Sequence, residues 1–389
     1  MTGNQKPNRV VVIGGGYAGA LAANHVLMRD DVAVTLVNPR PKFVERIRLH
    51  QHAAGNYNAT VGYDTLLADD VRLVVDTATR IDAAARTVEL ASGDTLDYDY
   101  LIYAVGSTGT VPASVPGAAE FAYPLAEFEQ AERLAARLQD VPLSAPLVVI
   151  GAGLTGIEAA SEFAEAGRNV VLVGNKLAPA MSAPARRSVA KALTKLGVTV
   201  IEGDVSAVSA HRVTLADGRF ISSAVTVWTA GFGTPQLAAA SGLRTDDLGR
   251  LLTDETMTSI DDPRIVATGD AAAPSGQPLR MSCQATSPLT VTAVGTVLSR
   301  IAGTEPKPLD PVFVGSCVSL GRHLATIQIA RKDDSSTNYY IGGRVGAKLK
   351  EAICKGTLWG IRRVANKPSA VFVMTGGKRA EQLAETVSA

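Results

Sequence analysis

The sequence is poor in cysteine, in net charge and in long hydrophobic runs, and each shortage excludes a class of protein. Its three cysteines are odd in number and widely spaced, which argues against a disulfide framework or a metal site and predicts reduced thiols. A formal net charge of +1 argues against a nucleic-acid-binding protein. No apolar run reaches the roughly 18 residues of a membrane span, and the polar N-terminus does not resemble a signal peptide. We therefore expect a cytoplasmic protein.

Aromatic residues are also scarce. They make up 5% of the chain, whereas hydrophobic residues in total reach 46%, so alanine, valine and leucine must fill most of the interior. This composition suits an α/β protein. A length of 389 residues is large for one hydrophobic core, and we therefore expect two or three domains.

What the sequence does contain is a glycine-rich motif close to its N-terminus. Four β-forming residues, 10–13, lead directly into it, and small residues at helical spacing follow. The motif consists of Gly14, Gly15, Gly16, Tyr17, Ala18 and Gly19. A strand, Gly-x-Gly-x-x-Gly and a helix in this order are typical of a dinucleotide-binding unit. The glycines allow a tight turn, close approach of a pyrophosphate and close packing of helix on strand.

A second copy of the pattern follows strand residues 147–150. Its glycines are Gly151, Gly153 and Gly156. Each copy is followed by a hairpin-like stretch and then by a strand that leads into a glycine, Gly106 after Ala104 in the first half and Gly231 in the second. An internal repeat of this size predicts two related nucleotide-binding domains.

The two halves differ where the second strand of each unit ends, a position that usually carries an acid for the ribose hydroxyls. Asn38 stands there in the first half, and its carboxamide oxygen can accept one hydrogen bond; a simple turn role is the alternative. Gly174 stands there in the second half, so no carboxylate would repel the extra phosphate of NADPH. The sequence therefore slightly favours NADPH.

Two observations bear on that preference from opposite sides. Lys176, Arg186 and Arg187 lie just downstream of Gly174 and could attract the extra phosphate. The third glycine of the motif is Gly156 rather than alanine, which leans towards NADH. We therefore keep both nucleotides as candidates.

A charged segment and a Gly-Asp motif supply further candidates. In the segment 42–52, Lys42 lies beside the expected phosphate site and Arg48 could neutralise pyrophosphate or lie over a cofactor ring; a solvated helix face is the alternative. His50 could exchange protons near such a ring. The strand at 265–268 ends in Gly269-Asp270, where a carboxylate could bind ribitol or ribose hydroxyls.

The segment 344–364 is basic and amphipathic. Val345, Leu349 and Ile353 recur every four residues, among six basic residues and one glutamate. Such a helix can lie on an anionic membrane, pack on a partner subunit in a homodimer, or cover its own protein. Gly356 and Gly360 weaken it as one continuous helix.

Taken together, these motifs resemble those of the flavoproteins with two dinucleotide-binding domains, and most of all type II NADH dehydrogenases and apoptosis-inducing-factor-like oxidoreductases. The resemblance covers residues 9–300 approximately. It implies an α/β fold with two Rossmann-like domains and a C-terminal α+β segment. The implied divisions are a discontinuous FAD domain at 1–123 and 253–310, an NAD(P)H domain at 124–252, and an interface or membrane-contact segment at 311–389.

The resemblance also implies roles for individual residues. It places Asp270 on the ribitol of FAD, Gln284 and Ala285 beside the isoalloxazine, and Glu158 near the nicotinamide. Gln284 matches a residue associated with the quinone pocket, although the residues after it depart from the usual pattern. Residues 38–66 hold no cysteine, which argues against the dithiol relay of disulfide reductases. With Gln284 and Glu158 for positioning and His50 for protons, we expect these three to be the catalytic residues.

The expected enzyme is an FAD-dependent NAD(P)H oxidoreductase that passes hydride from nicotinamide to flavin and electrons onward. The acceptor is a quinone or a small molecule, with a ferredoxin-like protein as a third option. A redox sensor or scaffold with slow turnover, and a flavin-dependent tailoring enzyme or monooxygenase, are the alternatives. A peripheral position of the protein on a membrane surface is kept as an alternative to a purely cytoplasmic one.

Overall fold

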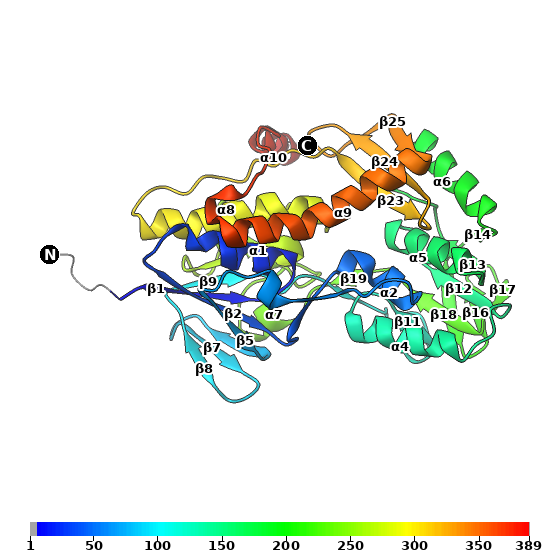
Figure 1. Cartoon of the computed structure of the whole chain (residues 1–389), viewed down its shortest axis with the longest axis horizontal. Helices are drawn as coiled ribbons and strands as arrows, with labels where there is room; N and C mark the ends of the chain where they lie inside the picture. The colour runs from blue at the N-terminus through cyan, green and yellow to red at the C-terminus, as the bar shows by residue number, and fades with distance from the viewer. Residues whose placement is uncertain (1–5, 389) are drawn as a thin grey trace.

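The computed structural model describes residues 6–388, and two five-stranded parallel sheets form its framework (Figure 1). The first sheet has the strand order β21-β9-β1-β2-β5. Its strands are β1 (Asn8–Ile13), β2 (Val32–Asn38), β5 (Val71–Val75), β9 (Tyr100–Tyr103) and β21 (Ile265–Ala267). Residues 10–13 of the central strand are buried, as expected for a strand covered on both faces. The last strand comes from a part of the chain that follows the whole second sheet.

The second sheet repeats the arrangement in the order β11-β18-β12-β13-β14. Its strands are β11 (Ala122–Pro124), β12 (Pro146–Ile150), β13 (Asn169–Gly174), β14 (Thr199–Glu202) and β18 (Val225–Trp228). The helices of this half are α3 (Ala118–Phe121), α4 (Phe128–Gln139), α5 (Leu154–Glu165) and α6 (Ala183–Lys195). The two Rossmann-like sheets confirm the expected fold class. The exact domain boundaries stay a prediction.

Each half also carries a small antiparallel sheet where the sequence repeats. These sheets are β6 (Ala78–Asp82), β7 (Thr87–Leu90) and β8 (Thr95–Asp97) in the first half, and β15 (Val205–Ser209), β16 (Arg212–Leu215) and β17 (Phe220–Ser222) in the second. Short two-stranded pairs join the rest: β3 (Lys42–Val44) with β4 (Thr60–Gly62), β10 (Thr108–Gly109) with β19 (Phe232–Gly233), and β20 (Leu251–Thr253) with β22 (Ala272–Pro274). The hairpin-like stretches in the sequence are thus three-stranded meanders.

Three helices lie together on one face of the first sheet, above it in Figure 1. They are α1 (Tyr17–His25), α8 (Cys283–Ile301) and α9 (Gly343–Asn366). The other helices are α2 (Leu49–Ala53), α7 (Leu237–Ala240) and α10 (Arg379–Ser388). The C-terminal sheet of β23 (Gly315–Leu320), β24 (Leu324–Ala330) and β25 (Ser336–Gly342) packs against α5, α6 and α9. The C-terminal segment therefore contacts both halves.

The α9 helix is continuous over 24 residues, despite Gly356 and Gly360. Cys354, Leu358 and Ile361 are buried along one side of it. Each glycine costs a helix about 1 kcal/mol relative to alanine, and the burial of this apolar side against α1 and β24 outweighs that cost. The expected weakening does not break the helix.

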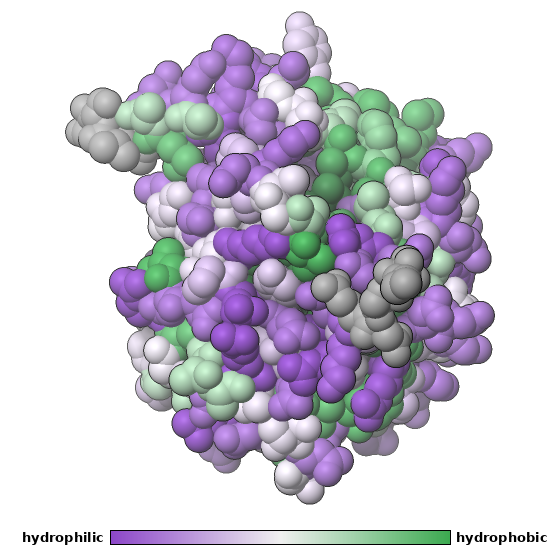
Figure 2. All heavy atoms as spheres, turned by 90° about the vertical axis from the view of Figure 1, so that its left-hand side faces the viewer, coloured by the Kyte–Doolittle hydropathy of each residue, from purple (hydrophilic) through white to green (hydrophobic). Residues whose placement is uncertain are grey.

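The surface at the end of the molecule that bears the N-terminus is largely hydrophilic, and its hydrophobic side chains gather at the upper right of the view (Figure 2). Elsewhere on the surface, the outer side of α9 exposes Val345, Leu349, Ile353 and Trp359. Among residues 6–388, none of the helices is both long enough and apolar enough to cross a membrane.

Candidate functional site

A cavity of about 460 Å³ opens at the carboxyl ends of the first sheet's strands, and we call it the first cavity. The loops that follow all five strands contribute to it. They bring in the glycine motif, Asn38, Asp76, Ala104 to Ser107, and Gly269-Asp270. Ligands of open parallel sheets bind at this edge. Most of the predicted cofactor contacts of the first half, including Lys42, line this one space.

The glycine motif is shaped by close backbone approach. Gly14 has φ +100°, and a Cβ added there would lie 2.3 Å from the carbonyl oxygen of Ala104. A Cβ at Gly19 would lie 1.7 Å from the carbonyl oxygen of Gly14. A Cβ at Gly16 meets no protein atom within 4 Å, because that position faces the cavity. Side chains are thus excluded where backbone packs on backbone, and a ligand can approach Gly16.

Asn38 holds the first glycine motif in place through hydrogen bonds to backbone groups. Its Oδ1 accepts a hydrogen bond from the Gly15 N–H at 2.9 Å, and its Nδ2 donates to the carbonyl oxygen of Arg40 at 2.8 Å. Tyr63 donates its hydroxyl hydrogen to the carbonyl oxygen of Gly15 at 2.7 Å. Asn38 lines the cavity, as the sequence predicts for a ribose-binding residue, but both of its carboxamide atoms already hold backbone groups.

Asp270 also lines the first cavity. Its Oδ2 accepts a hydrogen bond from Ser107 Oγ at 2.7 Å, and Ser107 Oγ in turn accepts from Arg46 Nη1 at 3.1 Å. This chain holds the carboxylate at the cavity wall, where it can accept hydrogen bonds from hydroxyl groups. An open glycine cradle and a fixed carboxylate in the same cavity fit the pyrophosphate and ribitol of FAD.

Arg48 lies outside the first cavity. Its guanidinium donates to both carboxylate oxygens of Glu351 in α9, at 3.1 and 3.0 Å, and to Gln51 Oε1 at 3.0 Å. It also stacks over the Tyr57 ring, with its central carbon 4.5 Å from the ring centroid. The side chain is 2% exposed, so this ion pair joins the first half firmly to the C-terminal segment.

Glu158 and His50, two of the predicted catalytic residues, meet where both halves adjoin the C-terminal segment. His50 Nδ1 lies 4.0 Å from Glu158 Oε2. Glu158 Oε1 lies 2.5 Å from Lys350 Nζ and accepts hydrogen bonds from the N–H and hydroxyl of Ser319, at 2.9 and 3.0 Å. All of these groups are buried or nearly so. Neither Glu158 nor His50 lines the first cavity.

Charges within this group decide its protonation. Burial lowers the pKa of His50 to about 4, so the imidazole is neutral at pH 7. Burial by itself opposes ionisation of Glu158, but the ammonium of Lys350 holds the pKa of Glu158 below its usual value. Burial likewise opposes the charge on Lys350, and Glu158 reverses this effect and raises the pKa of Lys350. The result is a buried ion pair beside a neutral histidine.

Gln284 and Ala285 lie in the first turn of α8, after the N-cap Ser282. Gln284 Oε1 accepts a hydrogen bond from Arg280 Nη2 at 3.2 Å. The same Arg280 nitrogen donates to the carbonyl oxygen of Gly315 at 2.7 Å. The helix start that the resemblance places beside the isoalloxazine is therefore tied to the C-terminal sheet.

The second glycine motif repeats the geometry of the first. A Cβ at Gly156 would lie 1.7 Å from the carbonyl oxygen of Gly151, and a Cβ at Gly153 meets nothing within 4 Å. Gly231 follows the last strand of this sheet and has φ +84°. The chain thus presents two equivalent cradles for dinucleotides, one in each half.

Gly174 leaves no room for a side chain. A Cβ built there would lie 2.7 Å from the backbone nitrogen and 2.8 Å from the Cβ of Ala152. Lys176 and Arg187 are exposed nearby in the sequence, whereas Arg186 turns back and donates to the carbonyl oxygen of Met181. No acid stands at this strand end, because Ala152 of the second glycine motif occupies the space that its side chain would need.

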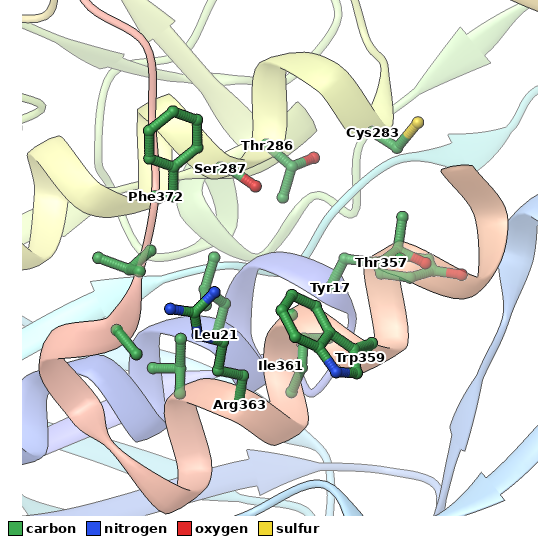
Figure 3. A pocket seen from close by; sticks show the side chains of 15 residues that line it. Tyr17, Leu21, Cys283, Thr286, Ser287, Thr357, Trp359, Ile361, Arg363 and Phe372 are labelled. Carbon is green, nitrogen blue, oxygen red and sulfur yellow. The ribbon is translucent and has the colours of Figure 1, made fainter. Parts of the chain in front are cut away.

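A second cavity, of about 220 Å³, lies between α1, α8, α9 and the segment after α9 (Figure 3). Its walls carry Tyr17 and Leu21 from α1, Cys283, Thr286 and Ser287 from α8, Thr357, Trp359, Ile361 and Arg363 from α9, and Phe372 from the tail. Tyr17 and Thr286 line the first cavity as well. The two cavities thus share a wall, and the second is mainly apolar with a few polar groups.

Two dinucleotide cradles, with a second cavity beside the first cradle, define the chain as a two-domain pyridine nucleotide flavoprotein. The family model described as pyridine nucleotide-disulphide oxidoreductase matches residues 8–295, and the chain belongs to that family. It is an FAD-dependent oxidoreductase of the NADH dehydrogenase-like kind, which uses FAD and NAD(P)H. These findings confirm the predicted class, fold and enzymatic nature.

Named relatives support this assignment. An NADH dehydrogenase-like protein of Mycobacterium tuberculosis is 35% identical over 292 residues, covering 68% of this chain and 73% of that protein. A type II NADH:quinone oxidoreductase of the same species is 29% identical over 374 residues, covering 83% and 80%.

Solved structures share the fold. Sulfide:quinone oxidoreductase from Aquifex aeolicus has a TM-score of 0.76 at 20% identity, with 92% of each chain covered. NDH2 from Plasmodium falciparum has a TM-score of 0.76 at 15% identity, with 94% of this chain and 97% of that one covered. The likeness extends into the C-terminal segment, beyond the part that the family model matches.

Sequence reasoning missed Lys350 as a site residue and treated it only as a charge on a basic helix. The signal was present, because Lys350, Cys354, Leu358 and Ile361 follow the spacing of one helix face, and the last three are apolar. A lysine on an otherwise apolar face needs a buried partner. Glu158 provides it from α5.

Proposed function

We propose that the protein is an NAD(P)H:quinone oxidoreductase in which the second cavity receives the quinone. The observation that carries this proposal is the wall shared by the two cavities, because Tyr17 and Thr286 line both. Bound FAD supplies the redox chemistry, and this chain holds it between the two substrates. A two-step reaction needs a donor site and an acceptor site that both adjoin the cofactor.

The shape and chemistry of the second cavity suit a quinone head group. Leu21 and Ile361 give it apolar walls, while Trp359 and Phe372 lie at the surface, 59% and 79% exposed. A flat apolar ring with carbonyl oxygens can bind among such side chains, with a few hydroxyl groups to orient it. A small polar metabolite would leave these apolar walls poorly matched.

An anaerobic flavin titration tests the proposal in two stages. NADH or NADPH should bleach the flavin of the purified protein, and a short-chain ubiquinone added afterwards should restore the oxidised spectrum. If the bleached flavin is reoxidised only by other acceptors, the second cavity binds another small molecule and not a quinone. A flavin that neither nucleotide reduces at a useful rate would favour the redox-sensor alternative.

We also propose that the outer side of α9 lies on a membrane surface, from which a quinone would enter. Val345, Leu349 and Ile353 are exposed there, 69%, 41% and 39%, and they repeat every four residues beside Arg344 and Lys348. An apolar stripe flanked by cations is the pattern of an interfacial helix. Sedimentation with anionic vesicles should carry the protein down, and Leu349→Glu with Ile353→Glu should abolish this.

For the nucleotide, we propose that both NADH and NADPH are accepted. The names of relatives point to NADH. Two features argue against strong discrimination between NADH and NADPH. Position 174 has no carboxylate and no room for one, and Lys176 lies exposed two residues later. Rates of flavin reduction by the two nucleotides, measured at matched concentrations, should then lie within about tenfold of each other, a difference of about 1.4 kcal/mol.

A further inference from the structure

Tyr17 directly follows Gly16, the second glycine of the Gly-x-Gly-x-x-Gly pattern, and begins α1. Tyr17 and Thr286 line both cavities. Of these two, only Tyr17 has a hydroxyl hydrogen that is not donated to another protein group. Thr286 donates its hydroxyl hydrogen to the carbonyl oxygen of Ser282 at 3.1 Å. The Tyr17 hydroxyl is buried and has no hydrogen-bond partner among the residues that the structure describes.

The surroundings of Tyr17 fix its ring and leave its hydroxyl without a well-formed hydrogen bond. Phe43 packs edge-on against the ring, with centroids 5.0 Å apart and an angle of 90°. Thr357 lies close by on α9 and donates its hydroxyl hydrogen to the carbonyl oxygen of Cys354 at 2.7 Å; its oxygen interacts with the Tyr17 hydroxyl, but in a geometry outside the limits of a normal hydrogen bond. An unpaired buried hydroxyl costs free energy until a ligand supplies its partner. Figure 3 shows Tyr17 among the side chains that surround the second cavity.

We propose that Tyr17 is a catalytic residue of the acceptor half-reaction, and that it donates its hydroxyl proton to a carbonyl oxygen of the quinone. This inference rests on the proposed quinone reductase function. Reduction of a quinone to a quinol consumes two electrons and two protons. The hydride from NAD(P)H accounts for both electrons and one proton. The second proton leaves Tyr17 Oη as a new O–H bond forms on the quinone, and a proton from solvent restores the phenol.

Electrostatics keep the Tyr17 hydroxyl protonated until a strongly basic oxygen, such as that of the quinol anion left by hydride transfer, accepts the proton. Burial raises the pKa of Tyr17 well above its usual value, and Glu45 adds to the effect, so the hydroxyl remains protonated at neutral pH. The second cavity is accessible to solvent, because Trp359 and Phe372 in its walls are exposed. The neighbouring cation of the cavity wall, Arg363, stacks on Trp359.

The test is Tyr17→Phe, which keeps the ring and its packing on Phe43 and removes only the hydroxyl. Three rates are measured on the holoenzyme: flavin reduction by NADH, turnover with ferricyanide, and turnover with a short-chain ubiquinone. Ferricyanide takes single electrons and needs no proton. We expect ubiquinone turnover to fall about 100-fold relative to the other two rates.

Tyr98→Phe is the matched control. Tyr98 also has a buried hydroxyl without a partner among the described residues, but it lines neither cavity. It should leave all three rates unchanged. Ubiquinone turnover of Tyr17→Phe at the wild-type rate would overturn the role of Tyr17 and leave the quinone reductase intact. A wild-type protein that reduces ferricyanide but no quinone would overturn the proposed function itself, and the role of Tyr17 with it.

Discussion

The two glycine motifs have the same backbone but opposite side-chain arrangements around it. In the first, Gly15 has no side chain and Asn38, at the end of the neighbouring strand, fills the space. In the second, Ala152 carries the side chain and Gly174 has none. The glycines that touch backbone, Gly19 and Gly156 among them, are equivalent. The backbone geometry of the motif is therefore fixed by the glycines that pack on backbone, whereas the residues at the x positions of Gly-x-Gly-x-x-Gly differ between the two halves.

Two further positions follow the same rule. Tyr17 of the first motif corresponds to Leu154 of the second, and Leu21 of α1 corresponds to Glu158 of α5. Leu21 and Tyr17 face the second cavity, whereas Glu158 pairs with Lys350. Substitutions that make one half resemble the other therefore test which differences matter.

The largest effect is expected from Glu158→Leu, which gives the second half the residue of the first. It leaves the ammonium of Lys350 buried without a counterion, which should cost about 3–5 kcal/mol in the free energy of unfolding. Urea unfolding of the apoprotein measures this. Adding Lys350→Met should recover most of the loss. If Glu158→Leu were as stable as the wild type, Lys350 would have to reach water without Glu158.

The next effect is in the pH dependence of stability, to which His50 beside Glu158 contributes. Its pKa is about 4 in the folded state against 6.5 in the ordinary one, so the unfolded chain takes up a proton that the folded chain refuses. The stability contributed by His50 is complete above pH 6.5 and is lost as the pH falls towards 4. The shift corresponds to about 3 kcal/mol.

Unfolding of wild type and His50→Gln at pH 7 and at pH 4.5 measures this contribution. The variant should lose less stability over that interval. His211→Gln, at an exposed histidine of the second half, serves as the control and should follow the wild type. Equal pH slopes for all three proteins would mean that His50 is readily protonated in the fold.

Gly15→Ala gives the first motif the residue of the second. The new Cβ would lie 2.1 Å from the Tyr63 hydroxyl and 2.9 Å from Asn38 Cγ, and such overpacking costs about 1–3 kcal/mol. The purified protein should melt at a lower temperature and carry less flavin. Gly16→Ala, whose Cβ meets no protein atom, should lose flavin without losing apoprotein stability.

The smallest effect is expected from the reciprocal exchange Ala152→Gly with Gly174→Asp, which gives the second half the glycine–polar arrangement of the first. The aspartate can accept hydrogen bonds from the ribose hydroxyls of NADH and repels the phosphate of NADPH. The ratio of flavin reduction rates should move about tenfold towards NADH. Gly174→Asp alone, which meets both the backbone nitrogen and the Cβ of Ala152, should reduce both rates instead; the double exchange removes the Cβ contact, and the backbone of residue 152 must still shift to admit the aspartate.

Local patterns in the sequence predicted much of this architecture. Both glycine motifs, the strands before them and the Gly269-Asp270 turn lie as expected, because each depends on residues close together in the chain. The contacts of Arg48 and Glu158 were out of reach, because their partners Glu351 and Lys350 are about 300 and 190 residues away. The sequence predicted the position of Asn38 at the cavity, but it did not predict the hydrogen bonds of Asn38 to backbone atoms.

Lys350 and Glu351 are neighbours in α9, yet they bind different halves of the molecule: Lys350 binds Glu158 of the second, and Glu351 binds Arg48 of the first. Farther along α9, the carbonyl oxygen of Ile361 accepts a hydrogen bond from Asn24. A helix joined to both halves makes the unfolding of one half costly for the other. The chain should therefore melt in a single cooperative transition, although it contains two separate sheets.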